Sequence, residues 1–174
     1  MADELVLRPL RPDDAIGGIK SGDVRFAALS QFAKKRAKKY ETEHLARTYV
    51  VADAAGKLKA YVTLVCSEVA SEDPLLDAAD IGYRHDTYPA VKIARLLVDH
   101  RARGGELGRL LVDFALGVAR TEICPAIGCR FVVVDAKQDS VGFYLKQGFT
   151  MIDTQENRGR DAPVMYVDLF KAAT

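Results

Sequence analysis

The sequence has few of the residues that mark disulfide-bonded or zinc-binding proteins. Its 174 residues include only three cysteines, Cys66, Cys124 and Cys129. An odd number without paired spacing argues against a disulfide framework. Cys124 and Cys129 also lack the tight C-x-x-C spacing of a zinc site, and no histidine lies close to them in sequence. We therefore expect three reduced thiols and no metal.

The sequence also lacks a membrane-spanning segment, a signal peptide and the strong net positive charge typical of proteins that bind nucleic acids. No apolar run reaches the length of a bilayer span, and the opening segment MADELVLRPL lacks the order of a signal peptide. The expectation is a cytoplasmic protein without a membrane partner. The net charge is +1, so a nucleic-acid partner would need a local basic patch.

The composition that remains is that of an ordinary globular protein. Hydrophobic residues make up 49% of the chain and charged residues 28%, which is enough apolar material for one core. Repeats, linkers and low-complexity tracts are missing. We predict a single domain over residues 1–174.

Hydrophobic periodicity predicts a mixture of strands and helices. The expected strands are 4–10, 47–53, 57–69, 91–99, 130–136, FTMID (149–153) and PVMYVDL (163–169). The expected helices are a short one from Asp13 and Asp14, then 22–40, 107–120 and 139–148. Residues 70–90 are predicted to form a long loop. This order indicates an α/β protein with one mixed sheet and helices on both faces.

Three of these elements carry more detailed expectations. The continuous apolar run 91–99 is typical of a strand buried on both faces. Helix 107–120 is expected to bury Leu107, Leu110, Leu111, Phe114, Ala115 and Val118. Helix 139–148 is expected to begin at a cap from Asp139 or Ser140 and to end at Gly148.

A glycine- and arginine-rich segment, DHRARGGELGR (99–109), joins strand 91–99 to helix 107–120. Glycines leave backbone N–H groups accessible, and a helix N-terminus adds partial positive charge, so the segment suits a phosphate. Arg101, Arg103 and Arg109 add charge and bidentate donors. Neither a Walker A loop nor a dinucleotide fingerprint fits the spacing. The alternative is a plain strand-to-helix turn with solubilising arginines.

RGGELG (103–108) resembles the pyrophosphate-binding loop, Arg/Gln-x-x-Gly-x-Gly/Ala, of the GNAT superfamily of N-acetyltransferases. FYLKQGF (143–149) resembles that family's FYxxxGF segment, and the element order matches over nearly the whole chain. The resemblance implies a GNAT fold, with a mixed, mostly antiparallel sheet of six to seven strands. It also implies acetyl-CoA as the cofactor. The implied cofactor-binding residues are Leu96, Leu97 and Val98, through their backbone, and Arg103, Gly104, Gly105, Glu106, Leu107, Gly108 and Arg109.

Glu106 stands where the family loop has its central glycine. In a first helical turn, the helix dipole stabilises such a carboxylate by about 0.3–1 kcal/mol. At about 6 Å from a pyrophosphate charge, with an effective dielectric near 20, it costs about 3 kcal/mol in repulsion. The neighbouring arginines offset that repulsion, so we expect cofactor binding to survive.

The family transfers acetyl directly from CoA to an amine, and a tyrosine commonly protonates the departing thiolate. The resemblance assigns this role to Tyr144. The alternative is that its ring packs against the sheet, although Phe143 is the expected core residue of the pair. Strand 91–99 has no glutamate for a general base. Asp135 either acts through water or caps the next helix, and His100 contacts either phosphate or solvent. Near neutral pH about a quarter to a third of an α-amine is uncharged, against about 0.1% of a lysine, which favours an α-amine acceptor.

Within the superfamily, segments 29–40, 47–53 and 88–99 resemble the GNAT toxins of bacterial toxin–antitoxin systems. That branch acetylates the α-amine of aminoacyl-tRNA, and the resemblance implies a ribbon-helix-helix antitoxin and a homodimer. Five cations either contact RNA phosphates in a salt-sensitive manner or form a solvated helix face. They are Lys34, Lys35, Arg36, Lys38 and Lys39. Three hypotheses result: an aminoacyl-tRNA acetyltransferase, an acetyltransferase of a small-molecule or protein amine, and a non-catalytic acyl-CoA-binding module.

Overall fold

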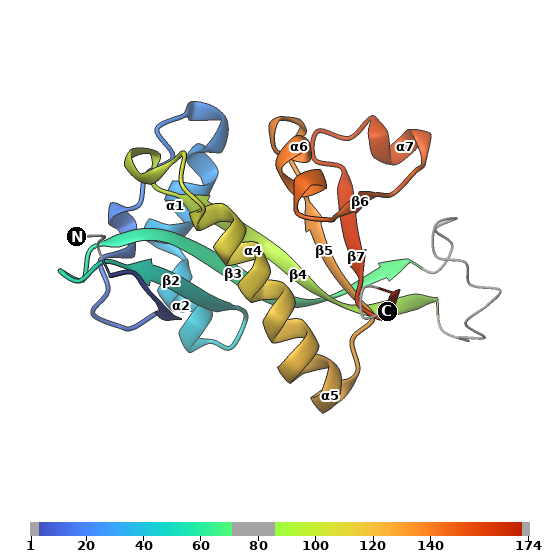
Figure 1. The fold of residues 1–174 in the computed structure, drawn as a ribbon, viewed down its shortest axis with the longest axis horizontal. Helices are drawn as coiled ribbons and strands as arrows, with labels where there is room; N and C mark the ends of the chain where they lie inside the picture. The colour runs from blue at the N-terminus through green and yellow to red at the C-terminus, as the bar shows by residue number, and fades with distance from the viewer. Residues whose placement is uncertain (1–3, 71–85, 172–174) are drawn as a thin grey trace. The chain divides into compact units, whose positions relative to one another are not determined.

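The structure, a computed structural model, describes residues 4–70 and 86–171. Within these residues seven strands form one sheet in the order β1-β2-β3-β4-β5-β7-β6 (Figure 1). Strands β4 and β5 pair in parallel, whereas the pairs β1–β2, β2–β3, β5–β7 and β6–β7 are antiparallel. The predicted α/β class and the mixed, mostly antiparallel sheet are confirmed.

The strands are β1 (Val6–Pro9), β2 (Arg47–Ala52), β3 (Leu58–Ala70), β4 (Thr87–Val98), β5 (Phe131–Asp135), β6 (Thr150–Met151) and β7 (Val164–Asp168). The helices are α1 (Ala27–Lys35), α2 (Ala37–Thr42), α4 (Leu107–Val118), α5 (Cys124–Ile127), α6 (Gln138–Lys146) and α7 (Gln155–Arg158). Short turns are η1 (Ile16–Gly18), η2 (Val24–Phe26), η3 (His100–Ala102) and a π turn, η4 (Ala119–Ile123). In the described ranges, no helix combines the length and the apolar content that a bilayer span requires.

The chain divides into two compact units. Unit 1 comprises Met1–Val65 and Ala94–Ala115, and unit 2 comprises Cys66–Ile93 and Leu116–Thr174. Strands β3 and β4 contribute residues to both units because the boundaries fall within them. The glycine-rich segment therefore belongs to unit 1, whereas Tyr144 belongs to unit 2.

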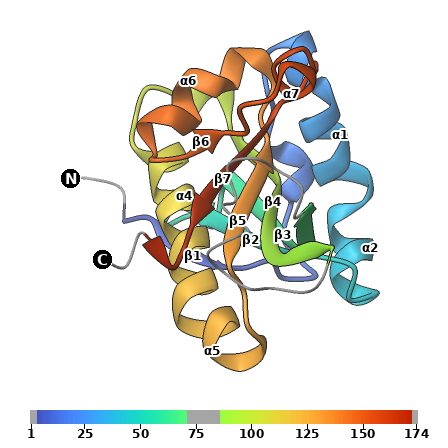
Figure 2. The same cartoon turned by 90° about the vertical axis from the view of Figure 1, so that its right-hand side faces the viewer.

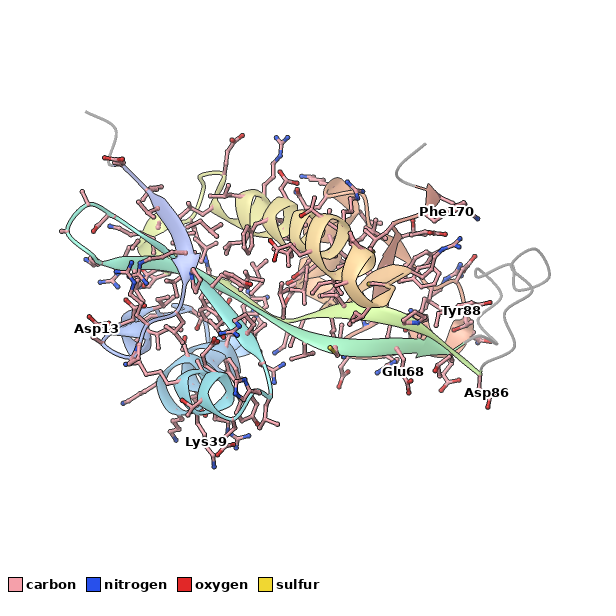
Figure 3. All side chains as sticks on the ribbon, turned by 90° about the horizontal axis from the view of Figure 1, so that it is seen from below. Asp13, Lys39, Glu68, Asp86, Tyr88 and Phe170 are labelled. Carbon is pink, nitrogen blue, oxygen red and sulfur yellow. The ribbon has the colours of Figure 1, made fainter. Side chains whose placement is uncertain are left out.

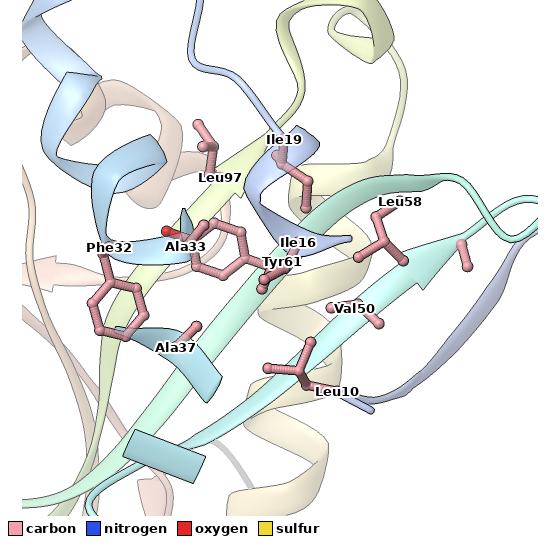
Figure 4. Packing of buried hydrophobic residues seen from close by; sticks show 11 residues of the cluster. Leu10, Ile16, Ile19, Phe32, Ala33, Ala37, Val50, Leu58, Tyr61 and Leu97 are labelled. Atoms are coloured by element: carbon pink, nitrogen blue, oxygen red, sulfur yellow. The ribbon is translucent and has the colours of Figure 1, made fainter. Parts of the chain in front are cut away.

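In unit 1, helices cover both faces of β2 and β3, as predicted. Helices α1 and α2 lie on one face and α4 on the other (Figures 2 and 3). Phe32 of α1 packs with Val50 and Tyr61 in the core of the first face (Figure 4). On the second face the ring of Tyr49 meets that of Phe114 edge to face, with centroids 4.6 Å apart. Each face buries apolar side chains because successive strand residues point to opposite sides.

In unit 2, a row of apolar side chains lies on one face of β4 and β5. Tyr88 and Ala90 of β4 belong to the same buried cluster as Phe131 and Val133 of β5. The register pairs Ala90 with Phe131, and alternate residues of a strand share a face. Ile152 completes this part of the core.

Strand β4 differs from its predicted form in two respects. It begins at Thr87, so part of the predicted loop is strand, and residues 71–85 of that loop lie outside the described residues. Its second half is not buried on both faces as predicted, because Arg95 is exposed. The guanidinium of Arg95 lies over the ring of Phe32, with its carbon 5.3 Å from the centroid. A cation on an aromatic face explains how an arginine is tolerated in an apolar run.

Two N-terminal predictions were also wrong. The helix predicted over 22–40 is divided into η2, α1 and α2, with Arg36 between the two α-helices at φ −129°. Asp14 does not start a helix. Its buried carboxylate accepts two 2.7 Å hydrogen bonds from Arg8 and one from the backbone N–H of Arg11, which ties down the chain after β1.

Helices α4 and α6 form where they are expected but differ in detail. Leu110 is 43% exposed rather than buried, because Leu111 and Ala115 occupy the face of α4 that meets the core. Neither Asp139 nor Ser140 caps α6, whose N-cap residue is Lys137 without a side-chain hydrogen bond. Gly148 follows the helix with φ +85°, consistent with the predicted stop.

Candidate functional site

The glycine-rich segment forms an open turn between β4 and α4. Gly104 has φ +87°, a conformation that favours glycine. A Cβ added at Gly104 would meet no atom within 4 Å, and at Gly105 the nearest atom would be 4.0 Å away. The first N–H groups of α4, from Leu107, have no partner within their own helix. The backbone therefore presents donors at an unobstructed surface, which is the chemistry a diphosphate requires.

Asp99 holds this turn in place from its buried side. Its side chain accepts hydrogen bonds from the backbone N–H groups of Lys20 and Arg101, each at 3.0 Å. The guanidinium of Arg101 contacts the same carboxylate at 2.7 and 2.8 Å. These bonds, those from the Arg101 side chain above all, hold the pKa of Asp99 well below its usual range, although burial opposes them. Arg101 therefore braces the turn, while the contact of Arg103 and Arg109 with a phosphate stays a prediction.

Residues 18–22 form the second support of the turn. The N–H of His100 donates to the carbonyl of Lys20 at 2.9 Å, and Arg103 Nη2 donates to the carbonyl of Ser21 at 2.6 Å. Gly22 has φ +65°, and an added Cβ would lie 2.7 Å from the Cβ of His100. His100 thus packs against Gly22. Sequence reasoning missed this support, because the only local signal is a glycine in a segment predicted to be helical.

Glu106 does not close the turn. Its side chain is 88% exposed, and Arg109 Nη1 lies 3.9 Å from its carboxylate. Arg109 also lies 3.5 Å from the carboxylate of Asp113. At such exposure water and salt screen the repulsion of a nearby phosphate below the value expected at an effective dielectric of 20. The residues of the turn fit a bound diphosphate.

The three β4 residues assigned to the pantetheine arm alternate in burial. Leu97 is buried in the core of unit 1, whereas Leu96 and Val98 are half-buried. A cavity of about 520 Å³ opens beside the turn in the same unit. Leu5, Lys59, Ala102, Gly105, Glu106, Leu107 and Leu110 line it. The cofactor contacts predicted for Leu96, Leu97, Val98 and residues 103–109 stay predictions.

Tyr144 is the buried aromatic residue of α6 in unit 2. It is 6% exposed, and its ring meets those of Phe143 and Phe149 edge to face at 5.0 and 5.3 Å. Phe143 is only half-buried, so the expectation that it is the core member of the pair was wrong. The turn at Gly148 brings Phe149 back onto Tyr144, whose carbonyl accepts the N–H of Phe149 at 3.1 Å. Burial raises the pKa of Tyr144 well above its usual range, so the phenol stays protonated at neutral pH.

A second cavity, of about 380 Å³, lies in unit 2 where the apolar row of β4 and β5 becomes polar. Lys92 Nζ lies 2.5 Å from Asp135 Oδ2 at its wall. The N-cap residue of α6 is Lys137, without a side-chain hydrogen bond, so Asp135 does not cap this helix and that alternative was wrong. The predicted role through water stays a prediction.

The five cations of the predicted basic surface are all exposed. Lys39 projects from α2 (Figure 3) and lies 3.8 Å from Glu43, and Lys38 Nζ donates to the carbonyl of Pro12 at 2.6 Å. A cavity of about 230 Å³ is lined by residues of η1 and of the segment that joins α1 to α2, including four of the cations. These are Lys34, Lys35, Arg36 and Lys38. Their contact with RNA stays a prediction.

The sequence matches the family model described as the acetyltransferase (GNAT) domain over residues 21–166. Because this match covers most of the chain, the protein belongs to the GNAT acetyltransferases and is an acyltransferase. The fold predicted from the two sequence motifs is thereby confirmed.

Solved structures of GNAT toxins share this fold over nearly their whole length. AtaT complexed with acetyl-methionyl-tRNAfMet has a TM-score of 0.83 at 18% identity, with 98% of each chain covered. A tyrosine-to-phenylalanine mutant of the AtaT toxin bound to the C-terminus of the antitoxin AtaR has a TM-score of 0.77 at 20% identity, covering 98% of this chain and 96% of that one. AtaTR bound with AcCoA has a TM-score of 0.79 at 19% identity, with 99% and 98% covered. The resemblance to GNAT toxins is confirmed.

Proposed function

We propose that this GNAT acetyltransferase transfers the acetyl group of acetyl-CoA to the α-amine of an aminoacyl-tRNA. The observation that carries the proposal is the near-complete match of its fold to AtaT complexed with acetyl-methionyl-tRNAfMet. Two features of this chain's own residues agree with it. They are an open anion-binding turn in unit 1 and a buried, protonated phenol in unit 2.

The turn between β4 and α4 holds the diphosphate of the cofactor. Backbone N–H groups from Gly104 to Gly108 donate to it, and Arg103 and Arg109 supply positive charge. The backbone of Leu96–Val98 receives the pantetheine arm. The neighbour AtaTR bound with AcCoA supports acetyl-CoA as the cosubstrate, which supplies a thioester as the activated acyl group.

Tyr144 provides the proton that the departing sulfur needs. The amine nitrogen forms a bond to the acyl carbon, the carbon–sulfur bond breaks, and the phenolic proton passes to sulfur. The amine loses one proton in the same overall reaction, which restores the phenol through solvent. Burial keeps Tyr144 protonated until it is used. An α-amine suits a site of this kind, because it needs far less help to lose its proton than a lysine.

The basic surface of unit 1 binds the RNA part of the acceptor. Its five cations are Lys34, Lys35, Arg36, Lys38 and Lys39, all exposed, and phosphate contacts of this kind weaken as salt rises. AtaT was solved bound to the C-terminus of its antitoxin, which supports an antitoxin partner here. We expect that partner to be a ribbon-helix-helix protein and the enzyme to be a homodimer.

Transfer of labelled acetyl from acetyl-CoA tests the proposal directly. Methionyl-tRNA should become labelled, and mild alkali should release the label as acetyl-methionine. Uncharged tRNA is the matched control and should stay unlabelled. Label that enters only a small amine or a peptide N-terminus would show that such an amine, and not aminoacyl-tRNA, is the acceptor. Cofactor binding without any transfer would indicate a non-catalytic module.

A further inference from the structure

The cavity of unit 2 has the chemistry of a receptor for an amine. Its apolar lining is Val69, Ala70, Val133, Ile152 and Val164, and its charged lining is Glu68, Lys92, Asp135, Glu156 and Arg160. We propose that Asp135 binds the ammonium group of the acceptor in place of Lys92, while the apolar wall receives the acceptor's side chain. This inference rests on the proposed transfer to an amine and names the residues that would recognise it.

The position of Asp135 follows from strand alternation. Phe131, Val133 and Asp135 point to one face of β5, and the first two belong to the buried cluster of unit 2. The register pairs Lys92 with Val133 and Asp135 with Val164 of β7. A row that is apolar over most of its length thus ends in a carboxylate. This arrangement places one charge at the edge of an apolar wall, as binding of an α-amine with an apolar side chain requires.

The ion pair at this edge contains the same group that the acceptor would bring. Lys92 Nζ lies 2.5 Å from Asp135 Oδ2, and the two side chains are 30% and 36% exposed. A lysine ammonium sits on a flexible four-carbon stem, so Lys92 can leave the carboxylate without movement of the strand. An incoming ammonium would then donate the same charge-assisted hydrogen bond to the carboxylate. Lys92 is therefore a placeholder for the substrate amine.

The remaining charges of the cavity favour a cation over a phosphate. Besides the paired Lys92 and Asp135, the charged lining consists of two carboxylates, Glu68 and Glu156, and one guanidinium, that of Arg160. The lining then carries one net negative charge, and departure of Lys92 from the cavity adds a second. An amine is attracted to such a lining, whereas a nucleotide phosphate is repelled. The occupant is the aminoacyl end of the acceptor rather than its RNA backbone.

Hydrogen bonds within the protein hold the α7 side of the cavity. The buried Asn157 donates from Nδ2 to the carbonyls of Ile152 and Val164, both at 3.0 Å, and accepts the N–H of Val164 at 2.8 Å. Gln138 Nε2 donates to the carbonyl of Arg160 at 2.8 Å. A wall formed in advance lowers the ordering cost of binding.

Methioninamide is the probe, because it combines a free α-amine, an apolar side chain and no carboxylate. Titration calorimetry would measure its affinity for the full chain, and steady-state assays would give KM and kcat for methionyl-tRNA. Asp135→Asn should lower methioninamide affinity and raise the KM for methionyl-tRNA, each by about ten- to a hundredfold, the range for a lost charged contact. The affinity for acetyl-CoA should not change. Lys92→Met should strengthen methioninamide binding, since it frees the carboxylate.

The two variants are expected to change methioninamide affinity in opposite directions, which separates a role in recognition from a role in structural support. If Lys92→Met weakens methioninamide binding as much as Asp135→Asn does, the pair is structural and the inference fails. Asp135→Glu keeps the carboxylate and should stay within a fewfold of the wild type. Asp168→Asn is the control, because it breaks the 2.8 Å ion pair with Arg130 outside the cavity lining. It should change the unfolding midpoint and leave methioninamide affinity unchanged.

The two proposals fail in different ways. Unchanged methioninamide affinity in a folded Asp135→Asn variant, with a wild type that labels methionyl-tRNA, overturns the recognition and leaves the enzyme function standing. A wild type that binds methioninamide through Asp135 but transfers acetyl to no amine overturns the enzyme function and leaves the recognition standing.

Discussion

The turn of unit 1 and the cavity of unit 2 are built from different parts of the polypeptide. The turn consists of backbone: a glycine at φ +87°, a helix N-terminus and carbonyls that accept from His100 and Arg103. The cavity consists of side chains that alternate along strands and end in Asp135. A backbone site tolerates an exposed side chain such as Glu106 but not an added atom at a close approach. A side-chain site depends on the identity of single residues.

The largest expected effect is on turnover and concerns Tyr144 of unit 2. Tyr144→Phe should lower kcat about 10²- to 10³-fold through loss of proton donation, while acetyl-CoA affinity stays unchanged. Because burial raises the pKa of Tyr144, wild-type kcat should not fall through its deprotonation anywhere below pH about 10. Assays of kcat against pH, with Tyr166→Phe as the control, would check both points. Full turnover in Tyr144→Phe would remove its role.

The next effect tests whether the turn depends on its close backbone packing. Gly22→Ala should destabilise the fold by about 1–3 kcal/mol more than Gly56→Ala, since overpacking adds to the strain of a positive φ. Both glycines have positive φ, but only at Gly22 would a Cβ collide, 2.7 Å from His100. Denaturant unfolding measures the difference, and acetyl-CoA affinity should fall in Gly22→Ala alone. Equal losses in the two variants would show that residues 18–22 do not support the turn.

A smaller effect is expected on the basic surface, which we propose binds the RNA part of the acceptor. Reversing Lys34 and Lys35 to Glu should weaken tRNA binding about tenfold at about 0.1 M salt and make its salt dependence shallower. Lys38 is left unchanged because it holds the carbonyl of Pro12. Reversal of Lys57 and Lys146 is the charge-matched control. Filter binding at several salt concentrations measures the effect. Equal losses of tRNA affinity in both double variants would mean that binding depends only on the net charge of the protein and not on this surface.

The smallest effect is expected at Glu106. Glu106→Gly should tighten acetyl-CoA binding by less than about tenfold, because an exposed carboxylate interacts weakly. Calorimetric titration of both proteins gives the ratio, and Glu106→Gln separates loss of charge from the added freedom of glycine. A wild type that fails to bind, rescued by Glu106→Gly, would mean that the carboxylate occupies the place of the diphosphate.

Sequence reasoning was accurate where a pattern is local. The hairpin predicted from 47–53 and 57–69 is present as β2 and β3, because alternation and a turn signal are both encoded within the segment. The glycine-rich segment lies between a strand and a helix as its composition indicates. Helix α7 was missed, because four residues are too few to show a period.

Errors arose where a charged partner from outside the predicted element overrides a local preference. Asp14 has the character of a helix start, but Arg8 engages its carboxylate first. Asp135 has the character of a cap for α6, but its carboxylate pairs with Lys92 of β4 and the N-cap residue is Lys137. In both cases a charged partner from another strand or turn decided the contact, and local sequence contains no record of that distance.

The amino-acid order alone determined the motifs of this protein: a glycine turn before a helix, a tyrosine in α6 and a cluster of five cations. It did so because glycine geometry, helix polarity and periodicity act over a few residues. The tertiary structure alone decided which polar groups meet. The carboxylate of Asp99 meets the backbone N–H of Lys20 across 79 positions, and the carboxylate of Asp135 meets the ammonium of Lys92 across 43 positions. Pairing across such separations depends on strand register and turn packing, which only the assembled fold provides.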